Sequence, residues 1–229
     1  IDHTVYTVDL LGCGRSDKSS ITYTNFVYVQ MISDFIKKII GQKTDVIASG
    51  FSGSFVTMAC HNEKELFNKI MLVNPPSLTQ LKQMPNRKDR LLKAALEIPI
   101  FGTLVYHMIV SRDNINNLFI EKMYYNPFHV DNQMADAYYE AAHKGGYYTR
   151  FLYFSLAAKY MNVNICHALK ALDNSIYIVE GETEPNGKAV TDDYCASNPA
   201  IEVSVLKETK HLPHVEAPEA FLEQVKIFF

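Results

Sequence analysis

Short apolar runs separated by stretches with a helical repeat make up most of the chain. Runs rich in β-branched residues predict strands at 4–9, 45–48, 70–73, 176–179 and 201–206. From Phe26 to Ile39, apolar residues recur at helical spacing, which predicts a helix that ends at Gly41. Further helices are expected near 189–196 and from Pro218 onward. Because strands alternate with helices, the predicted fold class is α/β with a mostly parallel sheet.

The strand pattern disappears between residues 77 and 172. This stretch has helical periodicity and many aromatic residues. We expect it to form a mainly helical layer over the carboxyl ends of the strands, where ligands bind in open α/β sheets. Residues 1–76 and 173–229 would then form the core. The aromatic residues suggest an apolar acyl or aryl ligand, although such residues also pack helices together.

The composition and net charge of the chain indicate which classes of binding partner to expect. The chain has 229 residues, which is enough for one domain with a sizeable core, and its net charge is −3. No basic surplus indicates nucleic acid or an anionic membrane surface as a partner. No apolar run reaches the roughly 20 residues of a membrane helix. The composition thus favours a globular protein that binds a small molecule, of unspecified oligomeric state.

The cysteines give no sign of a metal or redox site. All four are far apart in the sequence and form no CxxC pair: Cys13, Cys60, Cys166 and Cys195. We therefore expect reduced thiols in a cytoplasmic protein, without metal or cofactor.

The segment from Asp45 to Val56, DVIASGFSGSFV, carries the most informative pattern. An apolar strand runs into a turn of small residues, which leads directly into a helix. A serine nucleophile needs such a turn, with small residues two positions to either side; around Ser52 these are Gly50 and Ser54. The backbone N–H of Gly53 would be one donor to the oxyanion.

Other interpretations of this segment stay open. Ser54 fits less well as a nucleophile, because Val56 occupies a position that favours a small residue. Ser49 falls inside the predicted strand. The segment is also compatible with a plain Gly/Ser turn between a strand and a helix.

A serine hydroxyl needs a neighbouring base, and the base needs a carboxylate to orient it. His211 and His214 follow the last predicted strand, at the sheet edge where Ser52 would lie. The loop after the strand at 176–179 offers three carboxylates: Glu180, Glu182 and Glu184.

Two further motifs resemble a known family. Residues 9–16, DLLGCGRS, resemble the DxxGxGxS loop of α/β-hydrolase-fold enzymes of the esterase, lyase and dehalogenase type, and residues 211–221, HLPHVEAPEAF, resemble their HxPxxExPxxF signature. The resemblance implies a mostly parallel hydrolase-type sheet flanked by helices, with residues 77–172 as a helical cap. It makes Ser52 the nucleophile, His211 the general base and Glu184 the acid.

The chain departs from the family pattern at several positions. Phe51 stands where histidine is common, and we expect it to contact the substrate; Ser54 stands where glycine is common. Glu184 replaces the usual aspartate. Asn74 matches the alternative acid site but cannot carry the charge, and His214 matches a non-catalytic position.

The family also has three earlier strands and an HG loop that supplies a second oxyanion donor. Since neither is found in this sequence, we expect a fragment or a truncated product that hydrolyses esters poorly by itself. The leading hypothesis is a serine hydrolase acting on a small ester, amide or similar acyl substrate. The alternatives are a non-enzymatic ligand-binding or signalling protein of the same fold, and a lyase or cofactor-free haloperoxidase with the same triad.

Overall fold

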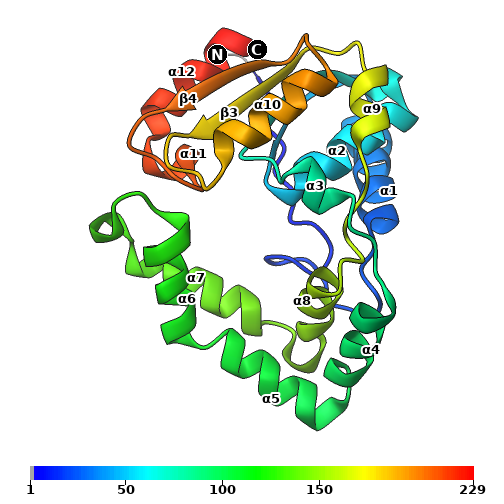
Figure 1. The fold of residues 1–229 in the computed structure, drawn as a ribbon, viewed down its shortest axis with the longest axis vertical. Coiled ribbons are helices and arrows are strands. Elements are labelled where there is room, and N and C mark those ends of the chain that lie inside the picture. Colours follow the sequence, from blue (N-terminus) through cyan, green and yellow to red (C-terminus); the bar gives the residue numbers. More distant parts are fainter. Residues whose placement is uncertain (1–2) are drawn as a thin grey trace.

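A four-stranded parallel sheet organises the protein (Figure 1). The computed structural model describes residues 3–229. The strands lie in the order of the sequence: β1 (Thr44–Ser49), β2 (Phe67–Val73), β3 (Ile176–Gly181) and β4 (Glu202–Leu206). These are the strands predicted at 45–48, 70–73, 176–179 and 201–206, and the predicted α/β class with a parallel sheet is confirmed.

The helices follow the predicted alternation. The α-helices outside the long insertion are α1 (Asn25–Phe35), α2 (Phe51–Asn62), α10 (Gly187–Ser197), α11 (Pro213–Glu216) and α12 (Pro218–Phe228). A π-helical turn, η1 (Ile36–Ile40), extends α1, and a 3₁₀ turn, η2 (Lys64–Leu66), precedes β2. The helix of residues 26–39 ends as predicted at Gly41, whose φ of 73° is the left-handed conformation that glycine adopts without strain.

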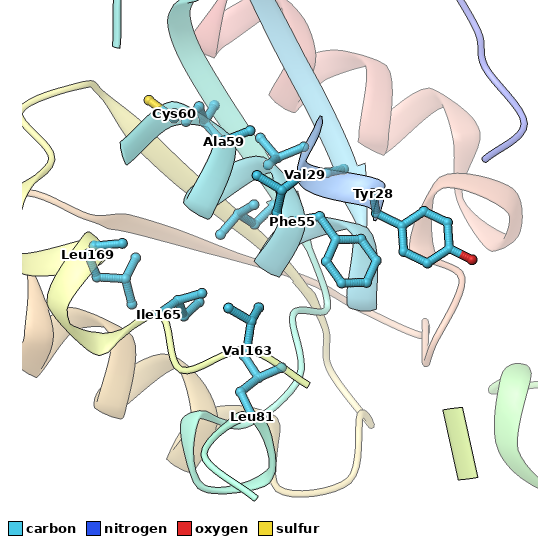
Figure 2. Close-up of a cluster of buried hydrophobic side chains, with 14 of the residues drawn as sticks. Tyr28, Val29, Phe55, Ala59, Cys60, Leu81, Val163, Ile165 and Leu169 are labelled. Atoms are coloured by element: carbon cyan, nitrogen blue, oxygen red, sulfur yellow. The ribbon is translucent and has the colours of Figure 1, made fainter. Parts of the chain in front are cut away.

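The two central strands, β2 and β3, are buried on both faces of the sheet. Ile70, Leu72 and Ile178 belong to the larger core with α1, α2 and α9 (Cys166–Ala171), part of which is shown in Figure 2. Met71 and Val179 pack on the opposite face against α12. Because side chains alternate along a strand, each central strand contributes to two cores.

The predicted strand at residues 4–9 is not present. The structure assigns no strand to residues 3–10, and Val5, Tyr6 and Val8 are 79%, 48% and 45% exposed. A strand needs a neighbour for its backbone N–H and C=O groups, which local sequence does not supply. The following Gly-rich turn does form: the Asp9 carboxylate accepts from the backbone N–H of Arg15 at 2.8 Å.

Residues 77–172 form helices and no strands, as predicted. Besides α9, the segment contains α3 (Leu78–Leu81), α4 (Arg87–Leu96), α5 (Pro99–Ile109), α6 (Arg112–Leu118), the π-helical η3 (Phe119–Met123), the 3₁₀ turn η4 (Pro127–His129), α7 (Asn132–His143), the 3₁₀ turn η5 (Gly146–Tyr148) and α8 (Arg150–Ala157). In Figure 1, α4 to α8 extend as an elongated layer below the sheet. Within residues 3–229 no single helix meets the length and hydropathy of a membrane span, although α4 and α5, bent by 96°, meet them together.

The ends of this segment join the core. Leu78 and Leu81 of α3, together with Val163, Ile165 and Leu169, belong to the main hydrophobic cluster. The middle of the segment instead packs on the loop after β4, where Leu212 is buried against Ile115, Phe119 and Tyr124. The segment therefore reaches the carboxyl edge of the sheet, and its treatment as a separate cap with boundaries at 77 and 172 stays a prediction.

Candidate active site

A one-residue turn joins β1 to α2. Gly50 is the only residue between Ser49, which ends the strand, and Phe51, which begins the helix. Its φ of 57° and ψ of −130° are a conformation that side chains strongly disfavour. The Gly50 N–H donates to the carbonyl of Val73 at 2.9 Å, which fixes the turn against the end of β2. The sharp turn expected around Ser52 therefore lies two residues earlier.

Ser52 lies in the first turn of α2. Its hydroxyl donates to the carbonyl of Ser49 at 2.7 Å, and no hydrogen bond joins it to His211 in the part of the chain that the structure describes. Because α2 begins at Phe51, Ser52 lies inside the helix and does not occupy the strained turn position. Its catalytic role stays a prediction, which this geometry does not support.

The expected oxyanion donor is already engaged. The N–H of Gly53 donates to the carbonyl of Gly50 at 3.1 Å, and Gly53 is buried. A Cβ atom at this position would lie 3.1 Å from Leu72, so the glycine permits close packing of α2 on β2. The oxyanion role of Gly53 stays a prediction, which this geometry does not support, because the first helical turn uses its N–H group.

The predicted base and acid are brought together. His211 lies in the loop after β4, and its Nδ1 is 3.1 and 3.2 Å from the two carboxylate oxygens of Glu184. Glu182 instead accepts from the backbone N–H of Glu208, and Glu180 is buried at the end of β3. Glu184, of the three candidates, is thus the one within hydrogen-bond distance of the imidazole, although it is one methylene longer than aspartate.

The signature that follows His211 holds this loop in place. The carboxylate of Glu216 accepts from the backbone N–H groups of Lys210 at 2.8 Å and Tyr125 at 2.6 Å. Pro213 and Pro218 stand in the first turns of α11 and α12, where a missing N–H costs nothing. The backbone N–H of His211 donates to the carbonyl of Met123 at 3.1 Å. The signature thus fixes the position of His211 between the sheet and the helical insertion.

Asn74, which follows β2, is a second anchor of the loop. Its amide nitrogen donates to the carbonyls of Lys210 and His211 at 2.8 and 2.9 Å, and its oxygen accepts from the N–H of Gly181 at 3.0 Å. The residue is 5% exposed and has a φ of 43°. Sequence reasoning found only that Asn74 could not act as the acid; its anchoring role depends on a loop distant in sequence.

Glu180 is a buried carboxyl group beside this pair. It is 5% exposed, and within residues 3–229 its Oε2 has no hydrogen-bond partner. Burial raises the pKa of Glu180; a hydrogen bond with Thr191 lowers it in part, and the charge of Glu184 raises it further. This places a carboxyl group with a raised pKa at the carboxyl end of β3.

His214 of α11 is a histidine of a different kind. Its Nδ1 is buried and has no partner among the described residues. Burial lowers the pKa of His214, and the neighbouring His211 lowers it further. The side chain is therefore a neutral packing residue, in agreement with its non-catalytic position in the signature.

His211, Glu184 and Glu180 line a cleft of about 330 Å³ at the carboxyl ends of the strands. Phe51 lines this cleft and Ser52 does not; a contact of Phe51 with the substrate stays a prediction. The lining is formed by residues from the ends of β1, β2 and β3 and from their connections: Gly50, Phe51, Asn74, Pro75, Pro76, Ser77, Gln80, Glu180, Glu184, Pro185, Asn186, Gly187, Val190, Thr191 and His211. A small ligand in this cleft would meet the His211–Glu184 pair and the Gly50 turn together.

Comparison with known proteins settles the family. The model of the alpha/beta hydrolase family matches residues 2–224. The chain belongs to this family. The comparison with curated proteins found no match.

Solved structures of this family share the fold. They include a 2-hydroxy-6-oxo-6-phenylhexa-2,4-dienoate hydrolase from Rhodococcus sp. strain RHA1 (TM-score 0.73, 17% identity, 96% of this chain and 78% of that chain covered). The epoxide hydrolase CorEH has a TM-score of 0.75 at 13% identity, with 96% and 80% covered. A structure from a study of carboxylesterases of Nitrososphaera gargenis has a TM-score of 0.69 at 15% identity, with 96% and 77% covered. The relatives are hydrolases, and at these identities the likeness is one of fold.

Proposed function

We propose that this alpha/beta hydrolase cleaves a small ester or similar acyl compound, with His211 as the general base and Glu184 as its orienting acid. The observation that carries the proposal is the contact between His211 Nδ1 and the Glu184 carboxylate, at the edge of a cleft lined by both residues. The two residues are 27 positions apart in the sequence, and a loop with only a structural role does not require this histidine and this carboxylate to meet beside a cleft.

The pair has the arrangement of a base and its orienting group. The Glu184 carboxylate accepts a hydrogen bond from the N–H at Nδ1, which leaves Nε2 as the nitrogen that takes a proton from the attacking group. The carboxylate also stabilises the imidazolium that forms. Anchors from Asn74 and Glu216 hold the loop, so the imidazole is positioned before substrate binds.

The cleft favours a compact substrate with an apolar part. Its volume of about 330 Å³ lies at the lower end of small-molecule sites. The apolar wall is formed by Phe51, Pro75, Pro76 and Val190, while Ser77 and Gln80 supply polar groups. These features support a small acyl or aryl ester as the substrate class.

The proposal gives no role to Ser52. A triad of Ser52, His211 and Glu184 requires the serine hydroxyl to leave the Ser49 carbonyl and enter a cleft that the residue does not line. A second candidate function, non-catalytic ligand binding, is favoured by one observation: a glycine without a hydroxyl occupies the sharp turn. The two functions differ in whether His211 supports turnover.

Hydrolysis of short-chain aryl esters tests the proposal. His211→Gln is expected to lower kcat/KM about 10²–10⁴-fold, the usual contribution of general acid–base catalysis. His129→Gln, at an exposed position outside the cleft, is the matched control and should leave kcat/KM unchanged. Equal activity of wild type and His211→Gln, or binding of esters without turnover, would overturn the proposal in favour of a binding protein.

A further inference from the structure

The turn between β1 and α2 has the geometry in which a nucleophile is presented, but its residue is Gly50. The φ and ψ of Gly50 are strained for any side chain, and the turn stands directly between a strand and a helix N-terminus. Two residues to either side stand Ala48 and Ser52, which are both small, as such a turn requires. Gly50 therefore has the backbone conformation and the small neighbours of a nucleophile position, but it has no side chain that could act as a nucleophile.

Gly50 also faces the same cleft as the base. Gly50, His211 and Glu184 all line it. A Cβ atom built on Gly50 would have no neighbouring atom within 4 Å, so a side chain here would project into open space. The following residue, Phe51, is the first of α2, where the helix leaves its N–H without an intrahelical acceptor and directs partial positive charge toward the cleft.

We infer that Gly50 holds the nucleophile position of this site, and that water attacks the substrate directly without a covalent acyl-enzyme. This inference rests on the proposed hydrolysis. Water forms the new C–O bond to the carbonyl carbon while its proton passes to His211 Nε2. When the tetrahedral intermediate collapses, the bond to the leaving oxygen breaks and that oxygen takes the proton from His211. One ester and one water give one acid and one alcohol.

Covalent labelling with a fluorophosphonate, mapped by peptide mass spectrometry, tests the assignment. Wild type and Ser52→Ala are expected to form no adduct at residue 52. Gly50→Ser should form an adduct at position 50 at least about tenfold faster than any labelling of wild type, because a hydroxyl there gains a base. Adding His211→Gln to Gly50→Ser should abolish most of this labelling.

Gly50→Ala is the matched control, since it carries the same backbone strain without a hydroxyl; circular dichroism of each variant reports folding. An adduct on Ser52 of wild type, or no labelling of folded Gly50→Ser, would overturn the inference. If Gly50→Ser does not fold, wild type decides: ester turnover without any acyl or phosphonyl adduct supports the inference, and an adduct on Ser52 contradicts it. If position 50 is labelled but wild type lacks hydrolysis that depends on His211, the proposed function fails while the assignment of Gly50 as the nucleophile position stands.

Discussion

The side-chain amide of Asn74 donates a hydrogen bond to the backbone carbonyl of His211 at 2.9 Å. The contact joins the end of β2 to the loop after β4, over 137 positions of the sequence. The same side chain also binds Lys210 and Gly181. One buried amide therefore sets where the imidazole stands relative to two strands.

We expect Asn74→Gly to lower both stability and activity. Glycine accepts the positive φ of this position, so the variant isolates the loss of the amide from backbone strain. The free energy of unfolding should fall by about 1–3 kcal/mol, because buried backbone groups lose their partners. Urea denaturation measures this change in stability. The loss in kcat/KM should also be larger than for Asn68→Gly, at an exposed position on β2, the strand that Asn74 follows. A variant with wild-type stability and kcat/KM would contradict the anchoring role.

The sheet and its order of helices could be predicted because the signals are local. Runs of β-branched residues found all four strands, and the helical repeat found α1, α10 and α12. The run at 4–9 has the same local character but no strand to pair with in the described chain, and pairing is not a local property. The helical nature of residues 77–172 could likewise be predicted, whereas its packing against Leu212 could not.

The base and acid could be predicted from motif spacing, but the nucleophile position could not. Two registers of the turn satisfy the small-residue pattern: Gly50 and Ser54 around Ser52, or Ala48 and Ser52 around Gly50. The choice depends on where β1 ends, and an uncertainty of two residues in a strand boundary is enough to change the chemistry. The strand ends at Ser49, which selects Gly50.

Glu180→Gln should change how stability depends on pH. Because burial raises the pKa of Glu180 in the folded protein, the folded state holds this proton more tightly than the unfolded state. That contribution to stability is complete below the ordinary pKa of 4.5 and is lost as pH rises through the raised value. We expect the stability of wild type relative to Glu180→Gln to decline as pH rises above 4.5, which urea denaturation at a series of pH values measures. Glu182→Gln, at an exposed position, controls for net charge; a difference that does not vary with pH would contradict the account.

Arg150 should be essential to the helical insertion. Its side chain is 1% exposed and donates to the carbonyls of Glu97 and Pro99 and to the hydroxyl of Thr103, while its guanidinium stacks over Tyr147. Arg150→Met would leave these buried acceptors without a hydrogen-bond donor. We therefore expect the free energy of unfolding to fall by at least about 2 kcal/mol. Arg150→Lys should also destabilise, because an ammonium cannot reproduce the planar fork.

Arg112→Met is the control for Arg150. Arg112 forms an ion pair with Asp136 in which both side chains are about half exposed, so its loss should cost about 0–1 kcal/mol. Thermal and urea unfolding would compare the variants. Equal destabilisation by Arg112→Met and Arg150→Met would show that burial of the Arg150 guanidinium is not what stabilises the helical insertion.

The most direct measurement of the central claim is a double-mutant cycle on His211 and Glu184, read as kcat/KM for a short-chain aryl ester. If Glu184 acts through the imidazole, His211→Gln should lower kcat/KM about 10²–10⁴-fold, Glu184→Gln less, and the double variant no further than His211→Gln alone. Losses that multiply independently, or a His211→Gln variant as active as wild type, would contradict a base oriented by Glu184.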